Sequence, residues 1–286
     1  MPEALAAGHA PANHAAGWHA RLALGFDRAD GRVRLARRAH SGPLAVQRPF
    51  HPEGPDVCHV YLLHPPAGIV GGDRLDIDAQ VDPGAHVLLT TPAATRFYRS
   101  AGAEAQLLQN VRVAAGATLE WLPQETILFD GAIARLCTRI DCEPGARILA
   151  WEIACLGRPA AGEQFARGHA DMCMEFHRDG RPLLLERLAF AAGSPVQAAR
   201  AGLMRMPVTA TLCLAPADAQ AAAQASALLA RAQGCIAGAT LIGDLLVVRV
   251  LAHDGAAARA AFERLWHALR PGFAGRPACA PRIWST

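Results

Sequence analysis

Three segments of the sequence share one pattern, in which a turn of small residues ending in Gly-Ala leads into a run of alternating apolar residues. These segments are 81-VDPGAHVLLTT-91, 113-VAAGATLEWLP-123 and 142-CEPGARILAWE-152, and their Gly-Ala steps begin at positions 84, 116 and 145. Repeats of about 30 residues are typical of coiled sheets in which each unit buries its apolar face against the next. The sequence therefore predicts a mainly β fold, with a coiled, solenoid-like β-sheet body (a β-superhelix). A β-sandwich that reuses one turn type is the alternative.

The chain divides into three parts by local pattern. Residues 1–17 are rich in Ala, Gly and His without periodicity, and we expect a disordered or loosely ordered tail. Residues 18–206 carry the repeats and further short strand patterns, and form the expected β body. Residues 207–286 follow the order strand, helix, strand, strand, helix, which predicts an α+β portion packed on the same body. This order resembles most of a ferredoxin-like unit, or equally a terminal layer of the β body.

Two helices are expected in the C-terminal portion, over residues 216–234 and 255–271. Pro216 lies near the start of the first helix, and Gly234 lies just past its end. Asp254 is the expected N-cap of the second helix. The second helix has one apolar face, formed by Ala258, Phe262, Leu265, Trp266 and Leu269.

All 28 basic residues are arginine, because the chain contains no lysine. This excludes a P-loop lysine, a Schiff-base lysine for pyridoxal phosphate and a lysine general base. The formal net charge is +3, and no basic run is interleaved with aromatic residues, so the sequence gives no sign of a nucleic-acid partner. A hydrophobic content of 52% with 19% charged residues is typical of soluble globular proteins.

The N-terminal residues lack the basic and long apolar segments of a signal peptide. No run reaches the length of about 18 apolar residues that a transmembrane helix needs. We therefore expect a cytoplasmic protein without membrane contact. The eight cysteines are scattered through the chain, and we expect reduced, mostly buried thiols.

The segment 64-HPPAGIVGGDRL-75 combines prolines and glycines in a way that could cradle a phosphate, hold a metal or turn the chain. It has no GxGxxG pattern, and the strand-like run 74-RLDIDAQV-81 follows it where a phosphate site needs a helix. The prolines and the Gly71-Gly72 pair instead suit a sharp turn between strands. We interpret the segment as a turn that shapes the body.

Metal-binding patterns are also weak. Cys58-His59 with His64 would place the two histidines on opposite faces of a strand. Cys137 and Cys142 are spaced more widely than structural zinc ligands usually are. The sequence thus predicts no tightly bound metal and no cofactor, although a transient metal path lined by oxygen atoms would leave no spacing pattern.

Catalytic patterns are equally scarce. No GxSxG motif is present, and no cysteine has a recognisable nucleophile context. Asp73, Asp76 and Asp78 alternate as on a strand, which favours a solvated face. The segments 89-LTTPAATRFYRS-100 and 121-WLPQETILFDGA-132 mix arginine, polar and aromatic residues, a composition more typical of protein interfaces than of catalytic centres. These patterns leave an enzyme possible but give it no support.

Five blocks taken together resemble the UreD family of urease accessory proteins, called UreH in some bacteria. The blocks are HPPAGIVGGDRL (64–75), LTTPAATRFYRS (89–100), WLPQETILFDGA (121–132), LGRPAAGEQF (156–165) and PRIWST (281–286). They occur in the family's order. One departure is Ala67, at a position where many relatives have glycine, so that the turn is tighter here.

The resemblance implies a non-catalytic scaffold with a coiled, mostly β body. It implies binding to apo-urease and to UreF, which recruits the GTPase UreG, and passage of nickel through an internal tunnel. We expect the nickel path to be lined by small or anionic oxygen-bearing residues of these blocks: Thr90, Thr91, Thr95, Asp130 and Glu163. We expect structural or interface anchors at Asp73, Arg74, Arg96, Tyr98, Arg99 and Trp284.

Two other classes of protein stay open at the level of sequence. A β-solenoid enzyme acting on a polysaccharide would need a long groove with carboxylates and exposed aromatic residues. A nickel-binding metallochaperone would need ligands that retain the metal.

Overall fold

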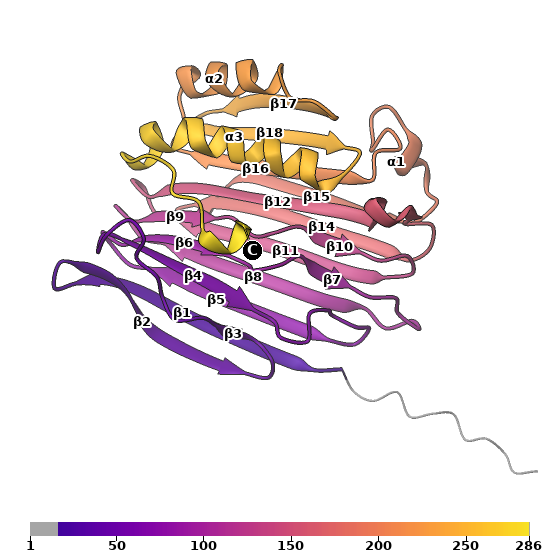
Figure 1. The fold of residues 1–286 in the computed structure, drawn as a ribbon, viewed down its shortest axis with the longest axis horizontal. Coiled ribbons are helices and arrows are strands. Elements are labelled where there is room, and N and C mark those ends of the chain that lie inside the picture. The colour runs from indigo at the N-terminus through magenta and orange to yellow at the C-terminus, as the bar shows by residue number, and fades with distance from the viewer. Residues whose placement is uncertain (1–16, 286) are drawn as a thin grey trace, which may run out of the picture.

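The computed structural model describes residues 17–285, and the predicted tail of residues 1–17 lies outside that range except for Gly17. Two large β-sheets face each other, and helices cover the outer side of one of them (Figure 1). Among the described residues, no helix is both long and apolar enough to cross a membrane. The fold is mainly β with a solenoid arrangement of strands, as the repeats predict.

Each repeat contributes one strand to each sheet. The first repeat joins β5 (Arg74–Val81) to β6 (His86–Thr90), the second joins β8 (Ala105–Val113) to β9 (Thr118–Trp121), and the third joins β11 (Ile133–Cys142) to β12 (Arg147–Arg158). Strands β5, β8 and β11 pair in parallel in one sheet, and β6, β9 and β12 pair in parallel in the other. This is the coiled stack that the period of about 30 residues indicates.

The Gly-Ala turns stack directly on one another. Gly84, Gly116 and Gly145 have φ angles of 74°, 69° and 82°, a left-handed conformation that glycine adopts without steric cost. The amides of Thr118 and Arg147 then donate to the turn of the preceding repeat, at 2.9 Å each. The repeated Gly-Ala sequence therefore forms the turn that connects a strand of one sheet to a strand of the other, in register with the preceding repeat.

The remaining elements extend both sheets. The seven-stranded sheet has the order β15 (Arg181–Ala191), β14 (His169–Arg178), β11, β8, β5, β1 (His19–Ala29), β2 (Arg32–Ser41). The eleven-stranded sheet has the order β17 (Cys235–Ile242), β18 (Leu245–Ala252), β16 (Val208–Ala215), β12, β9, β6, β4 (Val57–Leu63), β3 (Ala45–Val46). Off this path lie β7 (Thr95–Phe97), β10 (Thr126–Leu128) and β13 (Glu163–Gln164).

The C-terminal strands continue the eleven-stranded sheet, because β16 pairs with β12. They form a terminal layer of the β body and not a separate ferredoxin-like sheet. Helix α2 (Ala219–Leu229) begins at the N-cap Asp218, and α3 (Gly255–Ala274) begins at the predicted N-cap Asp254, whose carboxylate accepts from the amide of Ala257 at 2.7 Å. A short helix α1 (Pro195–Ala198) and 3-10 turns at Pro159–Ala161 and Arg282–Ser285 complete the described chain.

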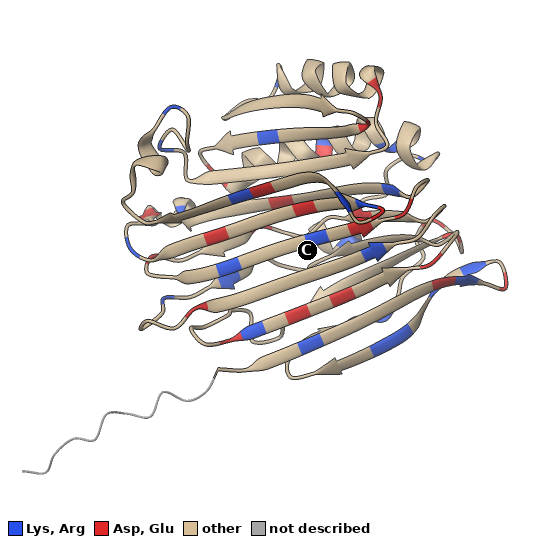
Figure 2. Ribbon diagram, turned by 180° about the vertical axis from the view of Figure 1, so that it is seen from behind, with Lys and Arg blue, Asp and Glu red and all other residues tan. Residues whose placement is uncertain are grey.

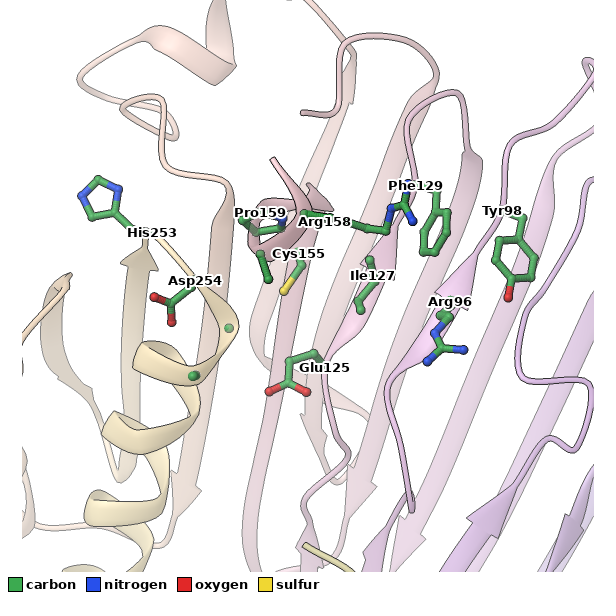
Figure 3. Close-up of a pocket in the computed structure, with 14 residues that line it drawn as sticks. Arg96, Tyr98, Glu125, Ile127, Phe129, Cys155, Arg158, Pro159, His253 and Asp254 are labelled. Carbon is green, nitrogen blue, oxygen red and sulfur yellow. The ribbon is translucent and has the colours of Figure 1, made fainter. Parts of the chain in front are cut away.

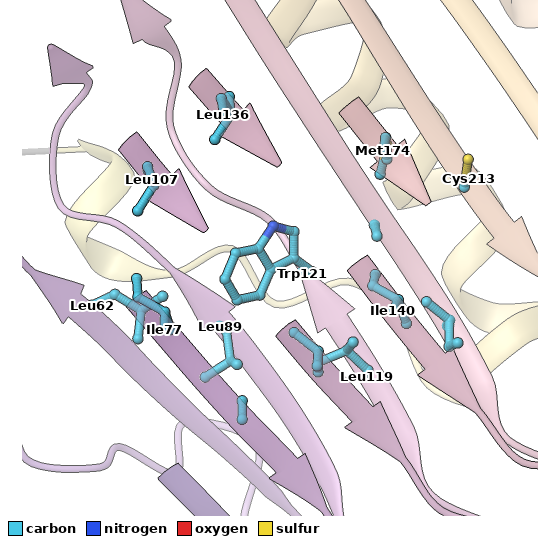
Figure 4. Close-up of a cluster of buried hydrophobic side chains, with 14 of the residues drawn as sticks. Leu62, Ile77, Leu89, Leu107, Leu119, Trp121, Leu136, Ile140, Met174 and Cys213 are labelled. Atoms are coloured by element: carbon cyan, nitrogen blue, oxygen red, sulfur yellow. The ribbon is translucent and has the colours of Figure 1, made fainter. Parts of the chain in front are cut away.

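Two hydrophobic layers hold the fold together. The first lies between the sheets, where Trp121 is surrounded by apolar residues from both sheets, such as Leu107 of the seven-stranded sheet and Leu89 of the eleven-stranded sheet (Figure 4). The second lies between the eleven-stranded sheet and the helices, where the ring of Trp151 lies 5.9 Å from that of Phe262. The outer face of the seven-stranded sheet carries bands of acidic and basic residues, and no helix of the described part of the chain covers it (Figure 2).

A buried ionic network ties α3 to the solenoid. The guanidinium of Arg270 donates to both oxygens of Glu120 and, at 2.7 Å, to both oxygens of Glu53. Glu120 also accepts from the indole of Trp266 and contacts His86 at 2.7 Å. Burial opposes ionisation, yet the hydrogen bonds from His59 and Arg270 outweigh it and lower the pKa of Glu53 to about 2.

Two expectations from the sequence are wrong. Cys137 and Cys173 form a disulfide between β11 and β14, so the thiols are not all reduced. Among the other cysteines, four are buried and free, as expected. Asp73 and Asp76 are buried, with 4% and 8% exposure, and therefore do not belong to a solvated face, whereas Asp78 is exposed. Each buried carboxylate is paired: Asp73 with backbone amides and Asp76 with Arg74.

Replacing Arg270 by methionine is expected to lower the free energy of unfolding by about 3–5 kcal/mol, because two buried carboxylates lose their counter-charge. Replacing the more exposed Arg276, which lies 3.9 Å from Glu53, by methionine is the matched control and should cost at most about 1 kcal/mol. Urea denaturation of both variants measures the difference. Equal losses would contradict this account.

Candidate functional site

The segment 64–75 turns the chain from β4 into β5, as interpreted from its sequence. Asp73 fastens it, because one carboxylate oxygen accepts from the amide of Trp18 at 2.8 Å and the other from the amide of Val70 at 3.0 Å. Ala67 adopts a φ of 62°, the left-handed conformation that glycine favours. A side chain at Gly68 would overlap the ring of Tyr98. The turn is thus packed against β7 and does not enclose a ligand itself.

Beside this turn, a cavity of about 400 Å³ runs into the space between the sheets. Its polar wall comes from two loops and two strands. His64 belongs to the turn, Thr91 and Thr95 frame the loop before β7, Arg96 lies on β7, and Gln109 lies on β8. Its apolar wall consists of inward-facing leucines and an isoleucine, including Leu62, Ile77 and Leu107. The cavity therefore joins the family-like loops to the interior.

His64 has a neutral imidazole whose nitrogen could bind a metal ion. Burial lowers the pKa of its imidazole, and the charge of Asp73 only partly opposes this. Its Nε2 is buried and makes no hydrogen bond to any described residue. A neutral imidazole nitrogen is a common ligand for borderline metal ions.

From the cavity, a line of polar side chains continues between the sheets; we call it the interior polar seam, formed by Gln109, Thr138, Glu152, Thr211 and Glu186. Gln109 and Thr138 lie opposite each other on β8 and β11, with their side-chain oxygens 2.6 Å apart. Glu152 reaches Thr138 from the opposite sheet. Thr211, opposite Glu152 on β16, donates to Glu186 at 2.9 Å.

The proton count of the seam indicates a neutral Glu152. Thr138 has one hydroxyl proton but contacts oxygens of both Gln109 and Glu152. A protonated Glu152 resolves this, because it donates to Thr138, which then donates to Gln109. Burial, reinforced by the charge of Glu186, raises the pKa of Glu152 to about 7, although the hydrogen bond between Glu152 and Thr138 opposes the shift.

The seam reaches the sheet edge at Glu186. A small cavity of about 60 Å³ lies between Glu152 and Glu186. Arg249 donates to the outer oxygen of Glu186 at 3.0 Å, which balances its charge near the surface. Polar groups thus follow one another from the His64 cavity to this edge, on the five strands β8, β11, β12, β16 and β15.

The structure divides the predicted path residues into groups. Thr91 and Thr95 line the His64 cavity. Thr90 is buried beside it, but its hydroxyl is engaged by the carbonyl of Leu122 and the indole of Trp284.

Asp130 and Glu163 lie together elsewhere, at the ends of the solenoid turns. Asp130 accepts from the backbone and guanidinium of Arg167, and Glu163 accepts from Arg158 at 3.0 Å. Hydrogen bonds from these arginines lower the pKa of both carboxyls. Both carboxylates therefore have close cationic partners.

The predicted anchors occupy several positions. Asp73 is buried, and Trp284 is half-buried with its ring edge-on to that of Trp266 at 5.6 Å. Tyr98 packs edge-on against Phe129 at 5.0 Å. Arg74 lies on the outer face of the seven-stranded sheet beside Asp76, and Arg99 covers Gly131.

Arg96 borders the cavity and also a surface groove of about 1040 Å³. This groove lies between β7, β10 and the start of α3, with Tyr98, Ile127 and Phe129 on one side and Asp254 on the other (Figure 3). The guanidinium of Arg96 has no hydrogen-bond or ion-pair partner among residues 17–285, so it is available to a partner molecule.

The carboxylates of the groove are both engaged. Glu125 accepts from Arg259 at 2.7 Å, and Asp254 caps α3. A glycoside-cleaving site needs two carboxyl groups that face the substrate, one acid and one base or nucleophile. The groove does not supply such a pair, and its arginine and aromatic residues are those that protein interfaces use.

Sequence reasoning weighed His64 only together with Cys58-His59 and dismissed it, and it missed Gln109, Thr138, Glu152 and Glu186 as candidates. Glu152 lies inside the third repeat, where the surrounding apolar residues mark an interior strand. An acidic residue at an inward position of that strand was the available signal, since buried carboxylates need a partner. The partners themselves come from other turns of the solenoid.

These features define a β-solenoid protein with a polar seam in its interior and an amphipathic groove on its surface. The sequence model of the UreD urease accessory protein family matches residues 19–285. A urease accessory protein UreD of Pseudomonas putida (strain W619) is 50% identical over 273 residues, covering 96% of each chain. A protein of the same name from Dechloromonas aromatica (strain RCB) is 46% identical over 277 residues, again covering 96% of each chain. The chain belongs to the UreD family of urease accessory proteins.

The carboxyl of Glu152 is expected to make stability fall with rising pH. Its pKa is raised from 4.5 to about 7 in the fold, so its contribution is full below about pH 4.5 and is lost as the pH rises through about 7. Glu152→Gln should remove this loss. In urea denaturation, its stability relative to wild type should improve between pH 5 and pH 8 by up to about 3 kcal/mol. Parallel pH profiles would contradict the assignment.

Proposed function

We propose that this chain is a non-catalytic scaffold of urease maturation in the cytoplasm. It binds apo-urease and UreF, reaches the GTPase UreG through UreF, and provides an internal route for nickel towards the urease active site. Membership of the urease accessory family supports a role in urease maturation. The observation that carries the nickel route is the interior polar seam that begins in the His64 cavity. Nickel is cargo here, and the proposal needs no resident cofactor.

The chemistry of the seam suits a cation in transit. The neutral imidazole of His64, the hydroxyls of Thr91 and Thr95 and the amide oxygen of Gln109 are weak, exchangeable ligands for a borderline divalent ion. Glu152 adds a switchable charge, because a nearby cation favours the ionised carboxylate and lowers its pKa. Its proton is then released as the cation arrives and is recovered as the cation leaves.

Replacing Glu152 by glutamine is expected to lower urease activation while the fold is kept. Glutamine has nearly the same shape and can donate to Thr138, but it cannot become an anion. In cells expressing urease and all other accessory proteins, urease activity and bound nickel should fall together by about tenfold, at constant urease abundance. Thr95→Val should act in the same direction.

Two controls give this experiment its meaning. Asp78→Asn changes an exposed carboxylate on the outer sheet face and should leave activation unchanged. The pair Asp130→Asn and Glu163→Gln tests the carboxylates at the edge of the solenoid, as an alternative route. If urease is fully activated both with Glu152→Gln and with Thr95→Val, the seam is not the route. Full activation in cells lacking the chain would overturn the scaffold function.

The surface groove is expected to receive one of the protein partners. Ala256 is an exposed residue in the wall of the groove, and arginine at this position would fill the groove without disturbing the core. Ala256→Arg should abolish co-purification with either UreF or apo-urease. Ala189→Arg, on the exposed outer face of the other sheet, is the matched control. Unchanged co-purification of both partners with Ala256→Arg would contradict this use of the groove.

A further inference from the structure

Cys137 and Cys173 lie directly opposite each other on the parallel strands β11 and β14, although 36 residues separate them in sequence. Their Cα atoms are 4.6 Å apart and their sulfurs are joined. Both are half-buried, and they alternate with core residues such as Leu136 and Met172, so their side chains point to the outer face of the seven-stranded sheet. No helix of residues 17–285 covers that face (Figure 2). Small molecules and ions therefore have access to this pair. The other cysteines of the described chain have no such cysteine neighbour.

A carboxylate completes the group on the same face. Glu175 lies two residues after Cys173, so both side chains project to the same side of β14. One ligand atom from each of Cys137, Cys173 and Glu175 can be chosen so that all lie within 4.8 Å of one another. The cation nearest to Glu175 is Arg139 at 3.8 Å, but Arg139 makes its close hydrogen bond, of 2.8 Å, to Asp141. Glu175 therefore has only this long ion pair, and its other carboxylate oxygen lies 3.9 Å from the sulfur of Cys173.

We propose that these three residues bind a divalent cation of borderline softness, such as Zn²⁺, when the two cysteines are reduced, and that their disulfide closes the site. Two thiolates and a carboxylate are the donors that such a cation selects, and water takes the fourth position of a tetrahedron. Each thiol releases its proton to solvent as its bond to the metal forms. The site lies outside the interior polar seam and goes beyond the proposed route for nickel.

The geometry requires only a local movement. In a tetrahedral site with metal–sulfur bonds of about 2.3 Å, the two sulfurs lie about 3.7 Å apart. Breaking the disulfide frees both side chains to reach that separation while the strands stay paired. The strands themselves are fixed, because β11 is hydrogen-bonded between β8 and β14 along its whole length.

Binding and oxidation exclude each other because both use the same sulfur electron pairs. Oxidised glutathione supplies the oxidising equivalents: two cysteine thiols and one glutathione disulfide give the protein disulfide and two glutathione thiols. The two thiol protons pass to the departing glutathione sulfurs, so atoms and electrons balance. Disulfides of cytoplasmic proteins are commonly reversible and redox-sensing, in keeping with a cation site that opens on reduction.

The test uses the purified full chain and cobalt(II) as a spectroscopic substitute for zinc. In the protein reduced with a phosphine and then freed of reductant under nitrogen, Co²⁺ should bind with one ion per chain and give thiolate-to-cobalt charge-transfer absorption. Oxidation with glutathione disulfide should abolish the absorption. Cys137→Ser with Cys173→Ser should abolish it in both redox states, and Glu175→Gln should weaken the affinity by about tenfold.

A matched control separates this site from thiols in general. Cys235 and Cys279 are the other two partly exposed cysteines, and replacing both by serine should leave the absorption unchanged. Circular dichroism checks that each variant keeps its β fold. Absorption that survives oxidation, that disappears in the control, or that is unaffected by Glu175→Gln would overturn the site. None of these readouts depends on urease activation, so they stand or fall separately from the nickel route.

Discussion

The fold depends on the parallel stacking of strands within each sheet, because every turn of the solenoid must place one strand in each sheet at a fixed offset. The backbone ladder enforces that offset: Arg74 pairs with Gln106 on the next turn, and neighbouring turns are linked again at their Gly-Ala corners. Once the ladder is formed, the inward side chains of equivalent positions lie in rows. Each row must then be uniformly apolar or internally hydrogen-bonded, since water does not reach most of it.

The interior polar seam follows from this requirement. Gln109 and Thr138 occupy equivalent inward positions on successive turns, so a polar side chain at one position favours a polar side chain at the next. Glu152 enters the same row from the opposite sheet, and its proton completes the hydrogen bonding. A line of polar groups across a β-solenoid interior is less stable than an apolar row of the same shape. We therefore expect the polar row to serve a function that offsets its cost in stability. A route for a small cation is such a function.

The sequence predicted the architecture better than the site, for a physical reason. The Gly-Ala corners are local signals, because a left-handed turn and the alternating strand after it are encoded in a few adjacent residues. The Asp254 cap and the apolar face of α3 are local in the same sense. The partners of Glu152 are not local: Thr138 and Gln109 lie on other strands, and only the stacking offset brings them together. The pairing of Cys137 with Cys173 depends on the same offset.

The loop residues show the same limit in a different form. Thr91 and Thr95 were predicted from their oxygen atoms and do line the cavity, whereas Asp130 and Glu163, chosen by the same criterion, have arginine partners at the solenoid edge. A carboxylate near a strand end attracts the nearest guanidinium, and this chain has only arginine as its basic side chain. Arginine presents a planar fork that matches a carboxylate with two hydrogen bonds. Exposed acidic residues in such a chain are therefore readily engaged by arginine. The fold shields Glu152 from arginine, and its carboxyl therefore stays available to a cation inside the body.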